Sequence, residues 1–268
     1  NTENVHYDFK KLPYLLHKYI IHYNYSASLM LFGTKAADLD NNGKVLAFAP
    51  TYSYKLPPNP TPDEIRQASI RTKVKELPGA KFELNMLSQF FKGVFVSDTA
   101  ATESRLKAEM QKARFSIIHL AMHGWVDNDR PEYSCLILTA DRDTIEDNML
   151  HAYEIPLLDI HSDMVVLSAC ETGFGRYERG EGVVSLGRGF MHAGANSIAM
   201  TLWSINDQAT AILMTHFYGK LSERMPKDRA LQEAKIAYIN SGDSITAHPF
   251  FWAGFVLIGD ESAIKLRR

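Results

Sequence analysis

Short apolar segments, each closed by a glycine or a polar residue, recur along this 268-residue chain and constrain its fold more than any other feature. The clearest two are residues 115–122, followed by His123-Gly124, and residues 164–169, followed by Cys170. Such runs are typical of buried strands in a parallel sheet. Segments with helical spacing alternate with them, so the sequence predicts an α/β protein with a mostly parallel sheet covered on both faces.

The same pattern predicts the other elements. Strands are expected at residues 28–32, 45–49, 94–96, 135–138, 197–200 and 255–258. Helices are expected after Pro78-Gly79, with Phe82, Met86 and Phe90 on the apolar face, after the N-cap Thr102, after Asn206 or Asp207, and after Asp228. The proline-rich residues 57–62 are expected to form a mobile connection.

Composition narrows the function classes. A net charge of −2 gives no reason to expect nucleic acid or an anionic membrane as a partner. Two cysteines are too few for a disulfide framework, which favours a reducing, cytoplasmic location. No apolar stretch approaches the roughly 18–20 residues of a membrane span, and no signal peptide opens the sequence. Because the chain begins with Asn, we expect it to be a piece of a longer protein.

A histidine and a cysteine at two strand ends suggest nucleophilic chemistry. Reactive groups in parallel sheets gather at the carboxyl ends of the strands, and a cysteine nucleophile needs an imidazole as its base. His123 and Cys170 are these two groups, and the backbone N–H groups of Gly124 and Cys170 could form an oxyanion hole. The alternative is that Cys170 is an inert core thiol. Cys135 lies within a predicted strand, so we expect it to be structural.

His123 and Cys170 lie in two of four sequence motifs that resemble motifs of the CHAT domain family. The four motifs are residues 119–124 (HLAMHG), 166–173 (VLSACETG), 202–207 (LWSIND) and 248–259 (HPFFWAGFVLIG). Their order and spacing are similar to those of the family from about Leu77 to Gly259, and the similarity is weaker upstream. As in caspases, the histidine lies about 50 residues before the cysteine.

The resemblance implies a caspase-like three-layer α/β/α sandwich and a cysteine endopeptidase related to separases and gingipains. His123 would be the general base and Cys170 the nucleophile, and the chemistry requires no cofactor. Residues 96–268 would form the catalytic domain, and residues 1–95 a smaller lobe resembling an inactive copy of the fold. Family members often follow tetratricopeptide repeats, so a repeat or sensor region is the expected partner, besides a protein substrate.

Two residues of the LWSIND motif bear on specificity. By resemblance to separases, Asp207 would lie in a pocket for a basic side chain next to the cleaved bond, and Trp203 would line it. A purely structural explanation is equally open, because an acidic residue at a helix start is favourable through capping and the helix dipole. Trp203 could likewise be a core residue.

Two alternative functions belong to different classes of protein. A non-catalytic interaction module could keep the fold and use the pocket only for binding. His119 and His123 have the His-x-x-x-His spacing of metal ligands, but the sequence offers no third ligand; His119 fits a core or supporting role better. The polar, glycine-flanked residues 175–182 could form an activation loop. The substrate, the activating signal and the oligomeric state are not encoded in any motif.

Overall fold

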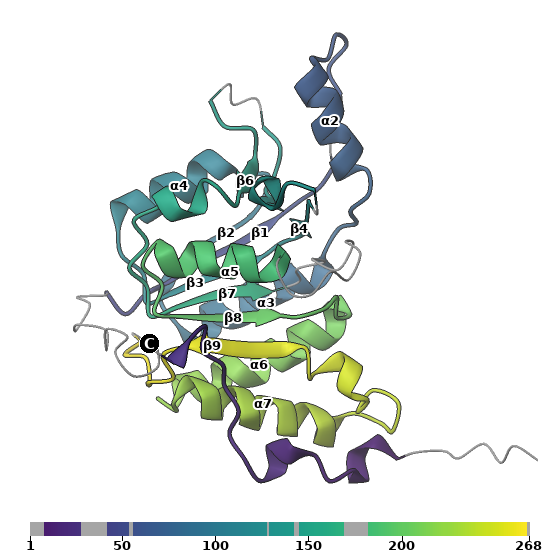
Figure 1. Cartoon of the computed structure of the whole chain (residues 1–268), viewed down its shortest axis with the longest axis vertical. Helices are drawn as coiled ribbons and strands as arrows, with labels where there is room; N and C mark the ends of the chain where they lie inside the picture. The colour runs from purple at the N-terminus through teal and green to yellow at the C-terminus, as the bar shows by residue number, and fades with distance from the viewer. Residues whose placement is uncertain are drawn as a thin grey trace, which may run out of the picture.

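The computed structural model describes residues 8–27, 42–53, 56–127, 129–141, 145–168 and 182–266. Its centre is a six-stranded sheet in the order β2-β1-β3-β7-β8-β9 (Figure 1). The strands are β1 (Val45–Pro50), β2 (Gly93–Asp98), β3 (Ile117–Ala121), β7 (Met164–Ser168), β8 (Ser197–Thr201) and β9 (Phe255–Gly259). All neighbours pair in parallel except β8 and β9. The predicted α/β class with a mostly parallel sheet is confirmed.

Helices cover both faces of this sheet. They are α3 (Pro78–Phe90), α4 (Glu103–Lys112), α5 (Gly182–His192), α6 (Asp207–Ser222) and α7 (Lys227–Ser241), whereas α2 (Pro62–Arg71) projects away from the sheet (Figure 1). One apolar core joins the sheet to α3, α6 and α7, and a second joins the other face to α4 and α5 (Figure 1). The architecture is therefore a three-layer α/β/α sandwich. No described helix is both long and apolar enough to cross a membrane.

A small antiparallel sheet adjoins the carboxyl end of β3. It consists of β4 (Gly124–Trp125), β5 (Cys135–Ile137) and β6 (Met149–His151). The buried Arg71 connects α2 to this small sheet. Its guanidinium donates to the backbone carbonyls of Leu138 at 2.6 Å and Asn148 at 3.0 Å. Short 3-10 helices are found at Phe9–Lys11, Leu15–His17, Pro131–Tyr133, Ile155–Leu157 and Pro249–Phe251.

The N-terminal part of the chain shares the main sheet. β1 pairs with both β2 and β3, and Tyr23 forms an isolated bridge to Ile258 of β9. A boundary at residue 95 would fall inside β2. The division into lobes at 1–95 and 96–268 stays a prediction, and any such boundary would have to cross this continuous sheet.

Most predicted elements are found, and the differences have local causes. Residues 28–32 lie outside the described residues. Helix α2 was not predicted, because its prolines favoured a loop; Thr61 and Glu64 in fact form a capping box at its start. The N-cap of α6 is Asn206, whose side chain accepts from two backbone N–H groups. Helix α7 begins one residue before Asp228, with Pro226 at its N-cap.

The predicted apolar face of α3 is wrong for Phe82, whereas Phe90 packs against the apolar core. Phe82 is 49% exposed, whereas the buried residues are Ala80, Glu83, Leu84 and Leu87. The buried stripe is thus centred on a carboxylate, which an apolar pattern cannot reveal. In the core this carboxylate accepts a hydrogen bond from the Ser168 hydroxyl.

Candidate active site

His123 lies just beyond the carboxyl end of β3, where the main sheet passes into the small one. It is almost fully buried. Its backbone N–H donates to the Tyr52 hydroxyl at 2.9 Å, and its carbonyl accepts from the Ile137 N–H at 2.9 Å. Bonds to separate elements therefore fix the backbone of the predicted general base on both sides.

The imidazole orientation follows from one contact. Nε2 of His123 lies 2.7 Å from the backbone carbonyl oxygen of Lys75. A carbonyl only accepts, so Nε2 carries the hydrogen, and in the neutral ring Nδ1 is then the basic nitrogen. Sequence reasoning missed Lys75 because its backbone makes the contact, and a backbone carbonyl leaves no signal in residue type.

The residues around Lys75 also hold the aromatic neighbour of His123. The ring centroids of Tyr52 and His123 are 4.7 Å apart. Glu76 accepts from the Thr51 hydroxyl and from the Tyr52 N–H, each at 2.8 Å. Residues 75 and 76 therefore position both the imidazole and the tyrosine packed against it, which preorganises the site.

Gly124 lies at a position of the small sheet that is not hydrogen-bonded to the partner strand. It pairs with Leu136 across the β4–β5 ladder, and the flanking bond runs from the Ile137 N–H to the His123 carbonyl. In an antiparallel ladder, residues next to such a bonded pair direct their own N–H groups away from the partner strand. The N–H of Gly124 therefore points away from β5.

Of the two cysteines, Cys135 lies in the described part of the chain. Cys170 lies outside the described residues; the last described residue before it is Ser168, which ends β7. Cys135 lies in β5 and is 1% exposed. Burial raises the pKa of the Cys135 thiol to about 12, so this cysteine is protonated and unreactive at neutral pH.

Asp207 joins the starts of two helices. It is the first residue of α6, and its carboxylate accepts from the backbone N–H of Gly79, near the start of α3, at 2.6 Å. A carboxylate is favourable at both helix N-termini. Gly79 follows Lys75 by four residues, so one short segment contacts both His123 and Asp207. No direct contact between those two side chains is present among the described residues.

Trp203 lies half-buried at the carboxyl end of β8. Its indole N–H donates to the Phe250 carbonyl at 2.9 Å. Its ring packs against Gly254, where a Cβ would come within 2.8 Å of the indole. These contacts give Trp203 a structural role beside β9, and whether it also lines a substrate pocket stays a prediction.

The proposed metal-binding pair is occupied by protein contacts. Nδ1 of His119 lies 2.8 Å from the Tyr218 hydroxyl, and Nε2 lies 3.1 Å from a Glu83 carboxylate oxygen. Neither ring nitrogen is directed at a shared site with His123. Among the described residues one acidic group has suitable spacing, Glu103, Glu146 and Glu154, and the Lys107 ammonium binds all three carboxylates.

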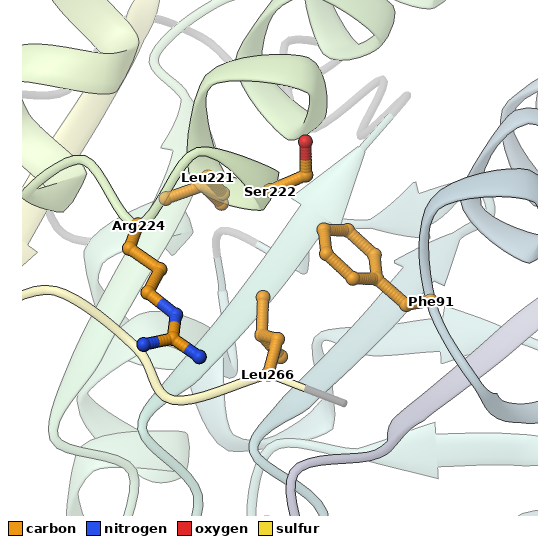
Figure 2. Close-up of a pocket in the computed structure, with 5 residues that line it drawn as sticks. All are labelled: Phe91, Leu221, Ser222, Arg224 and Leu266. Atoms are coloured by element: carbon orange, nitrogen blue, oxygen red, sulfur yellow. The ribbon is translucent and has the colours of Figure 1, made fainter. Parts of the chain in front are cut away.

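A cavity of about 330 Å³ lies elsewhere (Figure 2). Its lining residues are Phe91, Leu221, Ser222, Arg224 and Leu266. Phe91 precedes the start of β2, and Leu221 and Ser222 end α6. The cavity is therefore at the amino ends of the strands, away from His123, and is not part of the candidate site.

Comparison with known structures identifies the class of fold. The arginine-specific cysteine proteinase gingipain R matches over 83% of this chain and 47% of its own, with a TM-score of 0.50 and 10% identity. The complex of the pro- and mature domains of RgpB from Porphyromonas gingivalis matches with a TM-score of 0.50 and 11% identity, over 83% of this chain and 48% of that one. The fold is the caspase-like α/β/α sandwich of these proteinases.

Sequence comparison then gives the family. The model of the CHAT domain matches residues 4–260, so the chain belongs to the CHAT domain family. Tetratricopeptide repeat protein 28 is 30% identical in Mus musculus and 29% in Homo sapiens, over 122 residues and 46% of this chain. The matched region is 5% of the length of these relatives. The predicted family is confirmed.

Proposed function

We propose that this domain is a cysteine endopeptidase that uses His123 as general base and Cys170 as nucleophile. The observation that carries the proposal is the Lys75 carbonyl contact to His123, which makes Nδ1 the basic nitrogen of a buried, fixed imidazole. A base held in one tautomer at the carboxyl end of a parallel strand is what thiol activation needs. The caspase-like fold and the membership of the CHAT family support the same reaction class.

In the proposed reaction, Nδ1 of His123 takes the proton from the Cys170 thiol. The thiolate attacks the carbonyl carbon of the substrate, and the N–H groups of Gly124 and Cys170 stabilise the oxyanion. Collapse of this intermediate gives a thioester and expels the amine, which takes the proton from the imidazolium. Water, deprotonated by His123, then hydrolyses the thioester and releases the second product and the free thiol.

Asp207 is the proposed specificity residue. Its carboxylate already accepts from Gly79, so it would have to serve a basic substrate side chain through its second oxygen. This oxygen is buried and has no hydrogen-bond partner among the described residues. We therefore expect a preference for Arg or Lys before the cleaved bond, and Asp207→Asn should reduce it.

The proposed setting is a longer cytoplasmic protein with tetratricopeptide repeats. The two relatives, tetratricopeptide repeat protein 28 of mouse and human, are named for such repeats. The matched region is only 5% of their length. A repeat region in the same protein is the proposed sensor that controls cleavage of a protein substrate.

The test is intact-mass labelling with peptidyl acyloxymethyl ketones that carry Arg, Lys, Leu or Asp next to the warhead. Wild type should gain one adduct, strongest with Arg or Lys, and Cys170→Ala should gain none. Cys135→Ala is the matched control and should label like wild type, because the Cys135 thiol is buried and protonated. A preference for Leu would retain the protease and reject the role of Asp207. No adduct, in this domain and in the full-length protein, would favour a non-catalytic module.

A further inference from the structure

A buried polar chain crosses one face of the sheet close to the candidate active site. The Ser168 hydroxyl donates to a carboxylate oxygen of Glu83 at 2.7 Å. The same oxygen lies 3.1 Å from Nε2 of His119, and Nδ1 of His119 lies 2.8 Å from the Tyr218 hydroxyl. Each of the four residues is at most 2% exposed. We refer to Glu83, His119, Ser168 and Tyr218 as the buried polar chain.

The protonation pattern of this chain is self-consistent. Burial, reinforced by the charge of Glu83, raises the pKa of Tyr218 well above its ordinary range, so the phenol keeps its proton. The Tyr218 hydroxyl can then donate to Nδ1 of His119, and Nε2–H of His119 faces the Glu83 carboxylate. One oxygen of Glu83 thus accepts the hydrogen bond of Ser168 and also lies within ion-pair distance of Nε2 of His119.

That oxygen links the two strands that lead to the proposed dyad. His119 belongs to β3, and His123 follows four residues later; Ser168 ends β7, and Cys170 is two residues further along the chain. The strands are hydrogen-bonded neighbours, with Ala121 opposite Ser168. Glu83 therefore ties both strands to α3 at their carboxyl ends, and Tyr218 ties β3 to α6.

The buried polar chain stabilises the core less than apolar side chains of similar volume would. Burying polar and charged groups costs free energy that their mutual contacts only partly recover, and well-packed apolar side chains often do as well or better. The opposite face of the same strands carries only apolar side chains at the corresponding positions, among them Ile118, Leu120, Val165 and Leu167. Folding alone does not require the polar residues on the α3 face.

We propose that Glu83 and His119 are positioning residues, which hold the carboxyl ends of β3 and β7 so that the base and the nucleophile meet. This proposal rests on the proposed function. Segment 75–79, which immediately precedes and begins α3, supplies the Lys75 carbonyl to His123 and the Gly79 N–H to Asp207. Helix α3 thus holds the site at its first turn through backbone groups and one turn further on through the Glu83 carboxylate.

The test is the rate at which iodoacetamide alkylates Cys170 as a function of pH, followed by peptide mapping in a Cys135→Ala background. A paired thiol reacts with a midpoint below the value of about 8.5 for a free thiol. Glu83→Gln and Ser168→Ala should move this midpoint upward toward 8.5, where one unit is about a tenfold loss of thiolate at lower pH. On a peptide substrate, kcat should fall roughly 10- to 100-fold with little change in KM, as expected for a misplaced reacting group.

Ser197→Ala is the matched control. Ser197 is also fully buried and donates to the Asp163 carbonyl at 2.8 Å, but it begins β8 and so lies at the amino end of the neighbouring strand, away from the candidate site. It should lose comparable stability and keep the wild-type midpoint. A low midpoint in wild type that Glu83→Gln and Ser168→Ala leave unchanged would overturn the positioning role alone. A midpoint near 8.5 in wild type itself, with no ketone adduct, would reject the dyad and the positioning role together.

Discussion

The two faces of the central strands are built differently, although alternate residues of the same strands supply both. In β3, Ile118 and Leu120 face α4 and α5 and pack among apolar side chains. The intervening His119 faces α3 and α6 and is hydrogen-bonded to Tyr218. In β7, Leu167 faces the apolar side and Ser168 the polar one. One face therefore mainly stabilises the fold, whereas the other also carries groups that bear on the candidate site.

The largest expected effect comes from a cavity in the apolar face. Leu120 is fully buried, and Leu120→Ala should lower the free energy of unfolding by about 2–5 kcal/mol. The protein that remains folded should still react with the ketone at the wild-type rate, because the polar face is untouched. Urea unfolding gives the stability, and labelling at low urea gives the reactivity. A loss of labelling rate in fully folded Leu120→Ala would contradict the separation of the two faces.

The second prediction concerns the contact that fixes α3 beside Asp207. A Cβ at Gly79 would lie 2.6 Å from Oδ1 and 2.8 Å from the backbone oxygen of Asp207, so one of them must move. Gly79→Ala should therefore destabilise the protein by about 1–3 kcal/mol, although alanine favours helices. The change in thermal unfolding measures this effect.

Gly219 in α6 provides the opposite case. A Cβ there would lie 3.9 Å from Cζ of Phe90, which is an ordinary van der Waals contact. Gly219→Ala should stabilise the protein by about 0.5–1 kcal/mol through helix propensity. If Gly79→Ala stabilised the protein as Gly219→Ala is expected to do, the close approach of α3 to Asp207 would be contradicted.

The smallest expected effect lies outside both faces, at the Lys107 cluster. Burial raises the pKa of Glu103 to about 7 from an ordinary 4.5, against the opposing attraction of Lys107. The folded state then binds the proton more tightly than the unfolded chain, so this group makes stability fall as pH rises from 4.5 to about 7. Glu103→Gln should flatten that slope, with a gain on the order of 1 kcal/mol at pH 8.

Urea unfolding at several pH values checks this slope. Glu146→Gln is the control, because Glu146 contacts the same lysine from a more exposed position, with 21% of its side chain accessible against 1% for Glu103. It should leave the slope in place. An unchanged slope in Glu103→Gln would mean that another group titrates in this window.

Much of the fold was predictable from the sequence because the strands are almost purely apolar. Runs such as residues 164–168 can only be buried strands or buried helix, and their length favours strands. The antiparallel direction of β9 and the small sheet were not predicted, since strand pairing depends on contacts far apart in the chain. Helix α2 was missed although Thr61 and Glu64 carry its capping signal, because the surrounding prolines outweighed it.

The candidate site was predictable only in part. His123 could be placed because it ends a strand, and the motifs around it resemble a family that the comparison confirms. The Lys75 carbonyl could not, because any residue type supplies one. Glu83 was missed for a related reason: a glutamate in a helix is normally exposed, and only the buried His119 and Ser168 explain its position in the core. Cys170 stays a prediction.

The central claim is that the carboxyl ends of β3 and β7 form one thiol protease site, and the most direct measurement is a crystal structure of the ketone adduct. We expect a thioether on Cys170, with Nδ1 of His123 facing the sulfur. We also expect the adduct oxygen within about 2.7–3.1 Å of the Gly124 N–H. An adduct whose oxygen lies away from Gly124, with His123 turned away from the sulfur, would contradict this claim.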